Sequence, residues 1–435
     1  MIPLPFATGL TLGPFALLVL ALPVLLLGEA AIRRLPRLAR WNIPAPILSG
    51  LVVAVALLAC AEWLPGRITL QGSTADAVWL WSILPQWDLA APKPTDVERP
   101  LLILFFTCIG LNASWAVARQ GGRTLLVYLA LAASVAALQL ASGAATALAL
   151  GQSPLLGLMA GCVSLMGGFG TAAGFAPEFE KAGLPGAAAI GIAAAAFGVI
   201  AGGLIAGPIA GRLVRTKLGL GATAPAASAE PEAPAPAHGF IAELQDLARN
   251  PGSVLLHLAA LFVCMKLGAF VSVQLQQAGI TFPVYMGSML VAAGLRNLHD
   301  AAGGTWLRSD RTDGVASVAL MWLLTVVMID LQLHQLAHAA WPMLVILAVQ
   351  VALIAAIAYW IVFRVMGRNY EAATMSAGLI GFGLGATVNA VATMRELARR
   401  FGPAPRAFLI VTVVGAFLID FVNAVLITTA LNLCR

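Results

Sequence analysis

The chain has 435 residues, of which 60% are hydrophobic and only 10% are charged, and its mean hydropathy is +0.92. Soluble domains carry about 25% charged residues, so this composition excludes a soluble protein and indicates one that crosses a membrane repeatedly. The net charge of +6 comes mainly from basic residues between apolar runs. This placement favours a role in membrane orientation over nucleic-acid binding.

Ten apolar segments are long enough to cross about 30 Å of hydrocarbon. No basic region precedes the first segment, so we expect it to remain a membrane span rather than a removable signal. The sequence therefore predicts an all-α membrane protein with ten transmembrane helices, near residues 8–28, 44–62, 100–118, 124–150, 184–213, 252–278, 280–298, 315–336, 340–366 and 406–432.

Two glycine-rich stretches lie at corresponding places, one before the fifth segment and one before the tenth. Residues 161–176 read GCVSLMGGFGTAAGFA, and residues 378–394 read GLIGFGLGATVNAVATM. Clustered glycines disfavour a continuous helix and let the backbone bend and approach a ligand. We interpret both stretches as re-entrant loops, each followed by a charged turn at 178–181 or 395–397. Such interruptions in both halves of a chain are typical of a transporter's binding site.

Residues 216–250 differ from the rest of the chain. Most of this segment is Ala/Pro-rich and of low complexity, and such a sequence does not bury a core. Its last residues, FIAELQDLARN at 240–250, predict a short amphipathic helix. The segment therefore separates an N-terminal repeat, residues 1–215, from a C-terminal repeat, residues 251–435.

The basic residues favour one orientation in the membrane. With the N-terminus in the periplasm, 19 of the 25 lysines and arginines fall in cytoplasmic segments. Five crossings per half is an odd number, so the second half enters from the opposite side. This predicts inverted repeats, two periplasmic termini and a cytoplasmic linker. Matching motifs agree, because PILSG at 46–50 and PVYMG at 283–287 open the second segment of each half, and IGLN at 109–112 resembles IDLQ at 329–332.

Three ionisable side chains lie inside the predicted spans, where charge is costly and points to function. Asp420 is followed by Asn423 on the same helix face. Carboxylate and amide oxygens suit a hard cation, and we expect Asp420, Asn423 and Asn112 to bind sodium. The alternatives for Asp420 are a helix-packing hydrogen bond or a charge near the membrane interface. For Asp330 we favour snorkelling to water, and Lys266 is either a counter-charge or a snorkelling lysine.

The glycine-rich stretches offer backbone rather than charged side chains. A broken helix presents N–H groups that attract a carboxylate and carbonyls that coordinate a cation. The alternative is that the glycines only allow tight helix packing, which we favour for the pair Gly202 and Gly203. The predicted substrate-binding residues are Ser164, Gly167, Gly168, Phe169, Gly170, Thr171, Gly383, Gly385, Ala386, Thr387 and Asn389.

Other chemistries lack their sequence signatures. The five cysteines show no CxxC spacing and no HExxH motif is present, which disfavours disulfides and metal sites. GxSxG and Walker A motifs are also absent. We therefore expect a protein that is not an enzyme and does not draw energy from ATP. A channel is a further alternative, which would need a continuous pore and no coupling ion.

Seven motifs lie in order along the chain: FFTCIGLNA (105–113), GGR (121–123), GCVSLMGGFGT (161–171), FGVIAGGLIAGP (197–208), GFGLGAT (381–387), FGPAPRAFLIV (401–411) and GAFLIDFVNA (415–424). Together they resemble the bacterial sodium/glutamate symporter family over nearly the whole chain outside the linker. This resemblance implies two inverted five-helix repeats, two re-entrant loops meeting near the midplane, and a homodimer in the inner membrane. It also implies sodium-coupled import of L-glutamate by alternating access, with a substrate-carrying domain moving against a scaffold.

The sequence departs from the family pattern at a few positions. Phe169 replaces the His of GGHGT, and Leu379 stands near a second usual His. Both changes make the expected site more apolar, so a sodium symporter of another amino acid or a dicarboxylate remains the alternative. The other departures are Asp330, Val388, Thr393 and Thr412.

Overall fold

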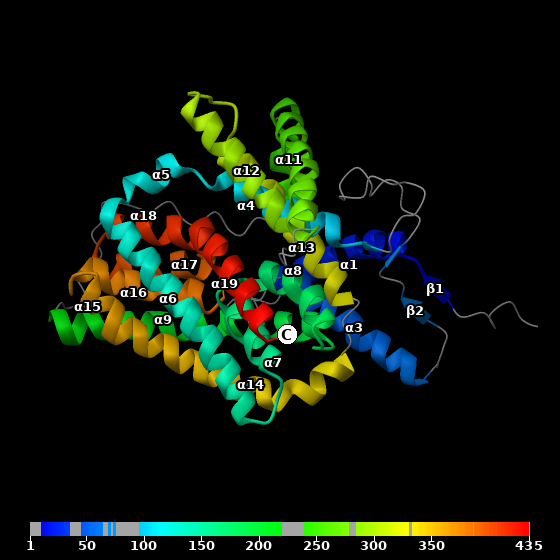
Figure 1. The fold of residues 1–435 in the computed structure, drawn as a ribbon, viewed down its shortest axis with the longest axis horizontal. Coiled ribbons are helices and arrows are strands. Elements are labelled where there is room, and N and C mark those ends of the chain that lie inside the picture. Colours follow the sequence, from blue (N-terminus) through cyan, green and yellow to red (C-terminus); the bar gives the residue numbers. More distant parts are fainter. Residues whose placement is uncertain are drawn as a thin grey trace, which may run out of the picture. The chain divides into compact units, whose positions relative to one another are not determined.

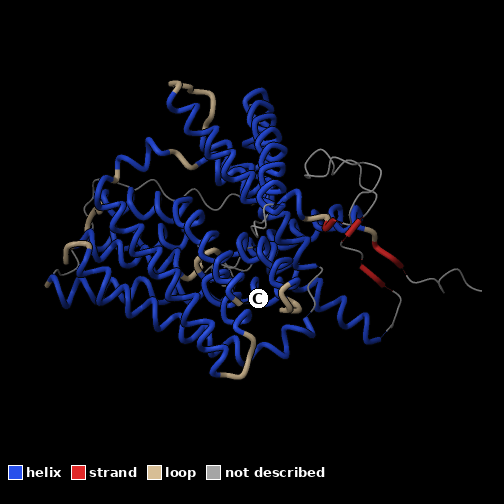
Figure 2. The backbone as a smooth tube through the Cα atoms, in the orientation of Figure 1, coloured by secondary structure: helices blue, strands red, loops and turns tan. Residues whose placement is uncertain are grey.

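The computed structural model describes residues 10–34, 45–63, 68–70, 73–74, 95–219, 239–249, 251–277, 284–329, 333–385 and 387–434. Helices make up nearly all of this part of the chain (Figure 2). Within it, strands form only two short pairs: β1 (Leu10–Leu12) is parallel to β2 (Ile68–Leu70), and β3 (Ser73–Thr74) is antiparallel to β4 (Thr95–Asp96). The structure is that of an α-helical membrane protein, as the sequence predicted.

The described helices form two compact units, and Figure 1 labels most of these helices one by one. The first unit holds the early helices of both halves: α1 (Pro14–Arg34), α3 (Ala45–Trp63), α4 (Arg99–Asn112), α10 (Phe240–Ala248), α11 (Pro251–Gln277), α12 (Val284–Ala301) and α13 (Ser309–Ile329). Its boundary falls inside helices, so that Asn112 and the end of α12 from Arg296 belong to the second unit.

The second unit holds the late helices of both halves, including three π-helical segments. From the first half come α5 (Trp115–Gln120), α6 (Gly122–Ala149), α7 (Pro154–Leu158), η2 (Met159–Val163), α8 (Gly168–Lys181) and α9 (Ala187–Leu218). From the second half come α14 (Leu333–Ile357), of which residues from His338 on belong to this unit, η3 (Ala358–Val362), α15 (Phe363–Val365), α16 (Tyr370–Gly383), α17 (Thr387–Phe401), α18 (Pro405–Val413), η4 (Val414–Leu418) and α19 (Ile419–Leu433).

Seven helical stretches among the described residues are long and apolar enough to cross a membrane, against ten expected. The other three expected segments, 44–62, 100–118 and 280–298, overlap α3, α4 and α12, which are not among these seven stretches. The seven stretches are Phe15–Arg34, Gly122–Ala149, Ala187–Leu218, Pro251–Leu275, Ser309–Ile329, Ala339–Val365 and Pro405–Leu433.

The expected span at 100–118 is wrong at its C-terminal end, because α4 stops at Asn112. Ser114 begins the next helix, α5, since its hydroxyl accepts a hydrogen bond from the Val117 amide in an N-cap. The same hydroxyl donates to Asp300 at 2.5 Å. Burial acts to raise the pKa of Asp300, but hydrogen bonds from Ser114 and Arg296 outweigh it and hold that pKa below its ordinary value. Polar contacts therefore break a segment that hydropathy alone reads as continuous.

Packing within the first unit is reciprocal between the two halves. A Cβ added at Gly28 of α1 would lie 2.6 Å from the Ala45 carbonyl oxygen of α3, and one added at Gly268 of α11 would lie 2.1 Å from Ser288 of α12. First and second helices of each half thus contact each other closely.

The second helix of one half also meets the third helix of the other. A Cβ at Gly50 of α3 would lie 2.3 Å from Met328 of α13, and a Cβ at Gly110 of α4 would lie 2.2 Å from the Met289 carbonyl oxygen of α12. Small residues commonly permit such close helix contacts in membranes. Gly50, the last residue of PILSG, therefore serves packing.

The predicted amphipathic helix after the linker is confirmed as α10, which is held against the first unit at both ends. At its start, the Phe240 amide donates to the carboxylate of Glu29 on α1. Towards its end, Arg311 of α13 donates to the Asp246 side chain at 3.2 Å and to the Asp246 carbonyl at 3.0 Å.

Candidate functional site

Both glycine-rich stretches fold as a helix, a short turn and a second helix, all within the second unit. The first turn lies at Met166 and Gly167, between η2 and α8, and the second begins at Leu384 and Gly385, after α16. The sequence predicted turns at the charged segments 178–181 and 395–397, and this is wrong. Residues 178–181 are the last helical residues of α8, and residues 395–397 are part of α17. Each stretch is thus a helical hairpin.

The two hairpin turns come together although they are more than 200 residues apart in the chain. Gly168 has a φ of +67°, and a Cβ added there would lie 2.9 Å from the Gly385 carbonyl oxygen. A Cβ added at Gly385 would lie 2.7 Å from the backbone nitrogen of Val199 on α9. Both turns and α9 therefore approach each other closely at these two glycines.

The first hairpin contains a break in its entering helix. Gly161 has non-helical dihedrals, φ −89° and ψ −120°, inside the π-helical segment η2. The buried Ser164 hydroxyl donates to the Met159 carbonyl at 2.5 Å, so this predicted ligand is engaged within the hairpin. Phe169 and Thr171 are also buried, with 8% and 5% of their surface exposed. Gly170 is likewise buried in the first turns of α8.

Side chains hold the second hairpin to its neighbours. Asn389 donates to the Val199 carbonyl of α9 at 2.8 Å, and Thr387 donates to the Gly415 carbonyl of η4 at 2.5 Å. A Cβ at Gly381 would lie 2.4 Å from Ala390, so α16 and α17 pack tightly. Ala386 lies outside the described residues. Two predicted ligands, Thr387 and Asn389, thus act here as anchors of the hairpin.

Sequence reasoning missed a pair of buried glutamines beside the second turn. Gln139 of α6 donates to the Gly383 carbonyl at 3.2 Å, and Gln350 of α14 donates to the Gln139 carbonyl at 2.8 Å. Both side chains are fully buried, and the side-chain oxygen of each has no hydrogen-bond partner among the described residues. The available signal was an amide inside each apolar segment, since polar groups at membrane depth tend to be functional.

The predicted sodium ligand Asn423 lies beside the first hairpin. The Cys162 thiol of η2 donates to its side-chain oxygen at 2.9 Å, and its side-chain nitrogen is buried without a partner among the described residues. Asp420 lies one turn earlier on α19 and is partly exposed. Helix α19 thus brings an amide oxygen to the break at Gly161.

The other candidate ionisable and polar residues lie elsewhere. Asn112 ends α4, and its carbonyl accepts from the Ser114 amide at 2.9 Å, next to the contacts with α12 described above. Lys266 lies on α11 in the first unit and is partly exposed. Asp330 lies outside the described residues. Within the described ranges, no three His, Cys, Asp or Glu side chains form a metal-binding group.

Comparison of the sequence with known proteins identifies one family. The family model described as sodium/glutamate symporter matches residues 73–403. The chain is 34% identical over 427 residues to a sodium/glutamate symporter of Haemophilus influenzae, covering 96% of each protein. It is 35% identical over 425 residues to a sodium/glutamate symporter of Escherichia coli, covering 97% of this chain and 98% of that one. No solved structure matches. The extent of these matches establishes that the chain belongs to the sodium/glutamate symporter family.

Proposed function

We propose that this protein is a secondary transporter that imports L-glutamate together with sodium across the bacterial inner membrane. Family membership makes the chain a transporter rather than an enzyme and identifies sodium as the coupling ion. The observation that carries the proposal is the approach of the two hairpin turns at Gly168 and Gly385. Curated relatives named sodium/glutamate symporters support glutamate as the substrate.

The substrate binds between the hairpin turns in this proposal. Helix N-terminal amides attract carboxylates, and α8 and α17 both begin at these turns, with Gly168 and Thr387. The amides of Gly168, Phe169, Gly170 and Thr171 supply donors in the first turn of α8. Residues 383–387 and Asn389 form the part of the site that the second hairpin contributes. Ser164 and Gly167 of the first hairpin are the remaining residues of the site.

Sodium binds near the break in the first hairpin. Oxygen ligands suit this hard cation, and Asn423 supplies an amide oxygen that now accepts from Cys162. Asp420 on the same helix provides the charge that offsets the cation. Asn112 is the third proposed ligand.

The chain is built from two inverted repeats of five crossings each in this proposal. Reciprocal packing supports this proposal, because α3 contacts α13 at Gly50 and α4 contacts α12 at Gly110. In both contacts the second helix of one half packs against the third helix of the other half. The two glycine-rich hairpins occupy equivalent places before α9 and α18, and we take both as re-entrant loops. The remaining three crossings in this proposal are α3, α4 and α12, of which α4 is the shortest at 14 residues.

Transport proceeds by alternating access, in which the second unit carries the substrate and the first is the scaffold. Both hairpins and both long helices that contact them, α9 and α19, belong to the second unit. The family resemblance adds a homodimer to this proposal, and the distribution of basic residues adds two periplasmic termini and a cytoplasmic linker.

A second candidate substrate is a less polar amino acid or a dicarboxylate. Phe169 has 8% of its surface exposed and Leu379 is fully buried, and both are apolar where the family commonly has histidine. Neither side chain can donate a hydrogen bond to a substrate carboxylate.

Uptake into proteoliposomes tests both candidates. Purified protein is reconstituted, and labelled L-glutamate uptake is measured with an inward gradient of sodium or of potassium. We expect saturable uptake with sodium only. Competition by unlabelled neutral amino acids and dicarboxylates then ranks the substrates. Uptake that neither saturates nor needs sodium would contradict the proposal and favour a channel.

A further inference from the structure

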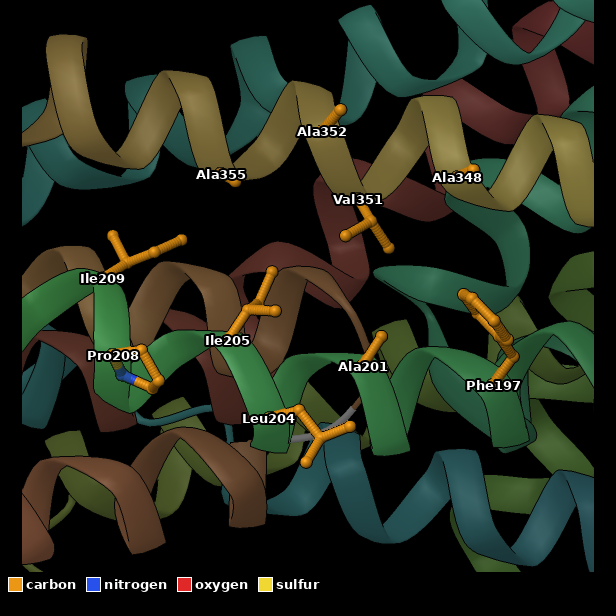
Figure 3. Close-up of a pocket in the computed structure, with 10 residues that line it drawn as sticks. All are labelled: Phe197, Ala201, Leu204, Ile205, Pro208, Ile209, Ala348, Val351, Ala352 and Ala355. Atoms are coloured by element: carbon orange, nitrogen blue, oxygen red, sulfur yellow. The ribbon is translucent and has the colours of Figure 1, made fainter.

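An open groove lies between α9 and α14 on the second unit (Figure 3). Its volume is about 630 Å³, and it is lined only by alanine, valine, leucine, isoleucine, phenylalanine and proline. Alanines on both helices, such as Ala201 and Ala352, leave the space open. Leu204 at its rim has 68% of its surface exposed. Such a lining offers no hydrogen bond and therefore suits a hydrocarbon chain.

Two exposed tryptophans place the groove at the depth of the bilayer's hydrocarbon. Trp341 and Trp360 have 72% and 55% of their surfaces exposed, and tryptophan favours the two membrane interfaces. Their separation of 19 residues along a nearly continuous helix corresponds to about 28 Å, close to the hydrocarbon thickness of about 30 Å. The lining residues of α14, Ala348 to Ala355, lie between them.

Positive charge gathers at one end of the groove. Figure 3 shows Ala348 towards the Phe197 end and Ala355 towards the Ile209 end, so α9 and α14 run in the same direction. Beyond Ile209, the lining face of α9 continues at Arg212, four residues after Pro208. A Cβ added at Gly211 would lie 3.6 Å from the Arg215 guanidinium, so this side chain lies back along the helix towards the groove.

The end of α14 adds to this charge. Ile209, which lines the groove, packs with Phe363 in one hydrophobic cluster together with Leu213, and Arg364 follows Phe363 directly. The described residues include no acidic partner for Arg212, Arg215 or Arg364. An apolar groove at hydrocarbon depth therefore ends near the interface at arginines that no acidic side chain of the described residues pairs with.

We propose that this groove binds an acyl chain of an anionic phospholipid of the surrounding bilayer, with the lipid phosphate held by Arg212 and Arg215. Arginine pairs well with phosphate oxygens, and basic sites between membrane helices suit anionic headgroups. The apolar lining selects the lipid tail, while the arginines select an anionic headgroup over a zwitterionic one. The binding site is separate from the hairpin turns and does not depend on the transported substrate.

Native mass spectrometry of the detergent-solubilised full chain tests the proposal by titration with phosphatidylglycerol or phosphatidylcholine. We expect phosphatidylglycerol to bind more tightly. Ala352→Trp fills the groove and should abolish the tightest binding event. Each basic residue near a lipid surface contributes about five-fold in affinity, so the double variant Arg212→Gln, Arg215→Gln should bind about 25-fold more weakly.

Matched controls separate the groove from general lipid contact. Ala137→Trp changes an exposed alanine on α6, and Arg399→Gln removes an exposed arginine on α17; both should bind phosphatidylglycerol as the wild type does. Equal binding by Ala352→Trp and wild type overturns the proposal, and so does equal affinity of the wild type for the two lipids. A dimer lost in Ala352→Trp with lipid binding unchanged would assign the groove to a second copy of the chain instead.

Discussion

Glycine at positions 168 and 385 leaves space that a side chain would fill with a clash. We expect Gly168→Val and Gly385→Val each to abolish sodium-driven uptake while the protein remains inserted. The added atoms at 168 would meet the Gly385 carbonyl at 2.9 Å, and those at 385 would meet Val199 at 2.7 Å. A φ of +67° at Gly168 adds strain for valine. Uptake in proteoliposomes, normalised to protein amount, is the measurement.

Gly203 provides the control for these two substitutions. No atom lies within 4 Å of a Cβ added there, so Gly203→Val should retain uptake, since valine is no poorer a helix former than glycine. Gly202 is unsuitable, because its added Cβ would lie 3.2 Å from Leu384 in the second hairpin turn. Full uptake by both hairpin variants would remove the turns as the binding site.

Asp420 supplies the charge in the proposed sodium site. Asp420→Asn keeps an oxygen ligand and the side-chain shape but removes the negative charge that offsets the cation. We expect sodium affinity to fall roughly ten-fold or more, about 1.4 kcal/mol, with a smaller effect on substrate affinity. Sodium-dependent thermal stabilisation of the purified variant measures this. An unchanged sodium titration would instead make Asp420 a packing residue.

Part of the candidate site could be predicted from residue types alone, and the rest could not. Clustered glycines identified the two turns because few other sequences tolerate that backbone. Asn423 was found through its spacing from Asp420. Gln139 was not found, since an uncharged amide in a long apolar segment gives a weak signal. The distinction between Gly202, in contact with Leu384, and Gly203, in open space, depends on tertiary packing that spacing alone does not contain.

At the level of elements, α6 holds the second hairpin through one side chain. Gln139→Leu removes the donor to the Gly383 carbonyl and leaves that buried oxygen unpaired, at a cost of about 1–3 kcal/mol. We expect the KM for substrate to rise several-fold, because the turn loses a fixed position. Gln152→Leu, at an exposed glutamine beyond α6, is the matched control. An unchanged KM in Gln139→Leu, with normal expression, would contradict this positioning role.

Hydropathy predicts the long apolar helices but does not predict where every helix begins and ends. Long apolar helices such as α6 and α9 were located to within a few residues, because an apolar run of that length has few alternatives. The expected span 100–118 was too long, since Ser114 caps a new helix and bonds to Asp300, 186 positions further on. The hairpins also had helical residues where charged turns were expected. Long-range polar contacts of this kind are invisible in a local window.

For the whole molecule, the proposed orientation predicts which surfaces a reagent can reach. A cysteine at Ser228, in the linker outside the described residues, should resist an impermeant thiol reagent in intact cells. A cysteine at Ser73 should react. Both cysteines are introduced into a variant that already carries Cys60→Ser and Cys434→Ser, since Cys434 is partly exposed. The native cysteines that remain, Cys108, Cys162 and Cys264, are buried. The reverse labelling pattern would overturn the orientation.

The short helix α4 links this protein to the thickness of its bilayer. Its 14 residues span about 21 Å, whereas the hydrocarbon layer is about 30 Å thick. The 32 residues of α9 extend well beyond that layer, at about 48 Å. In the proposed ten-span arrangement α4 crosses this layer, and one membrane thickness then cannot match both helices, so the bilayer deforms or helices tilt around the chain. Lipids with shorter tails relieve the mismatch at α4 and increase it at α9. The length of the acyl chains therefore changes the energy of every conformation that the two units adopt.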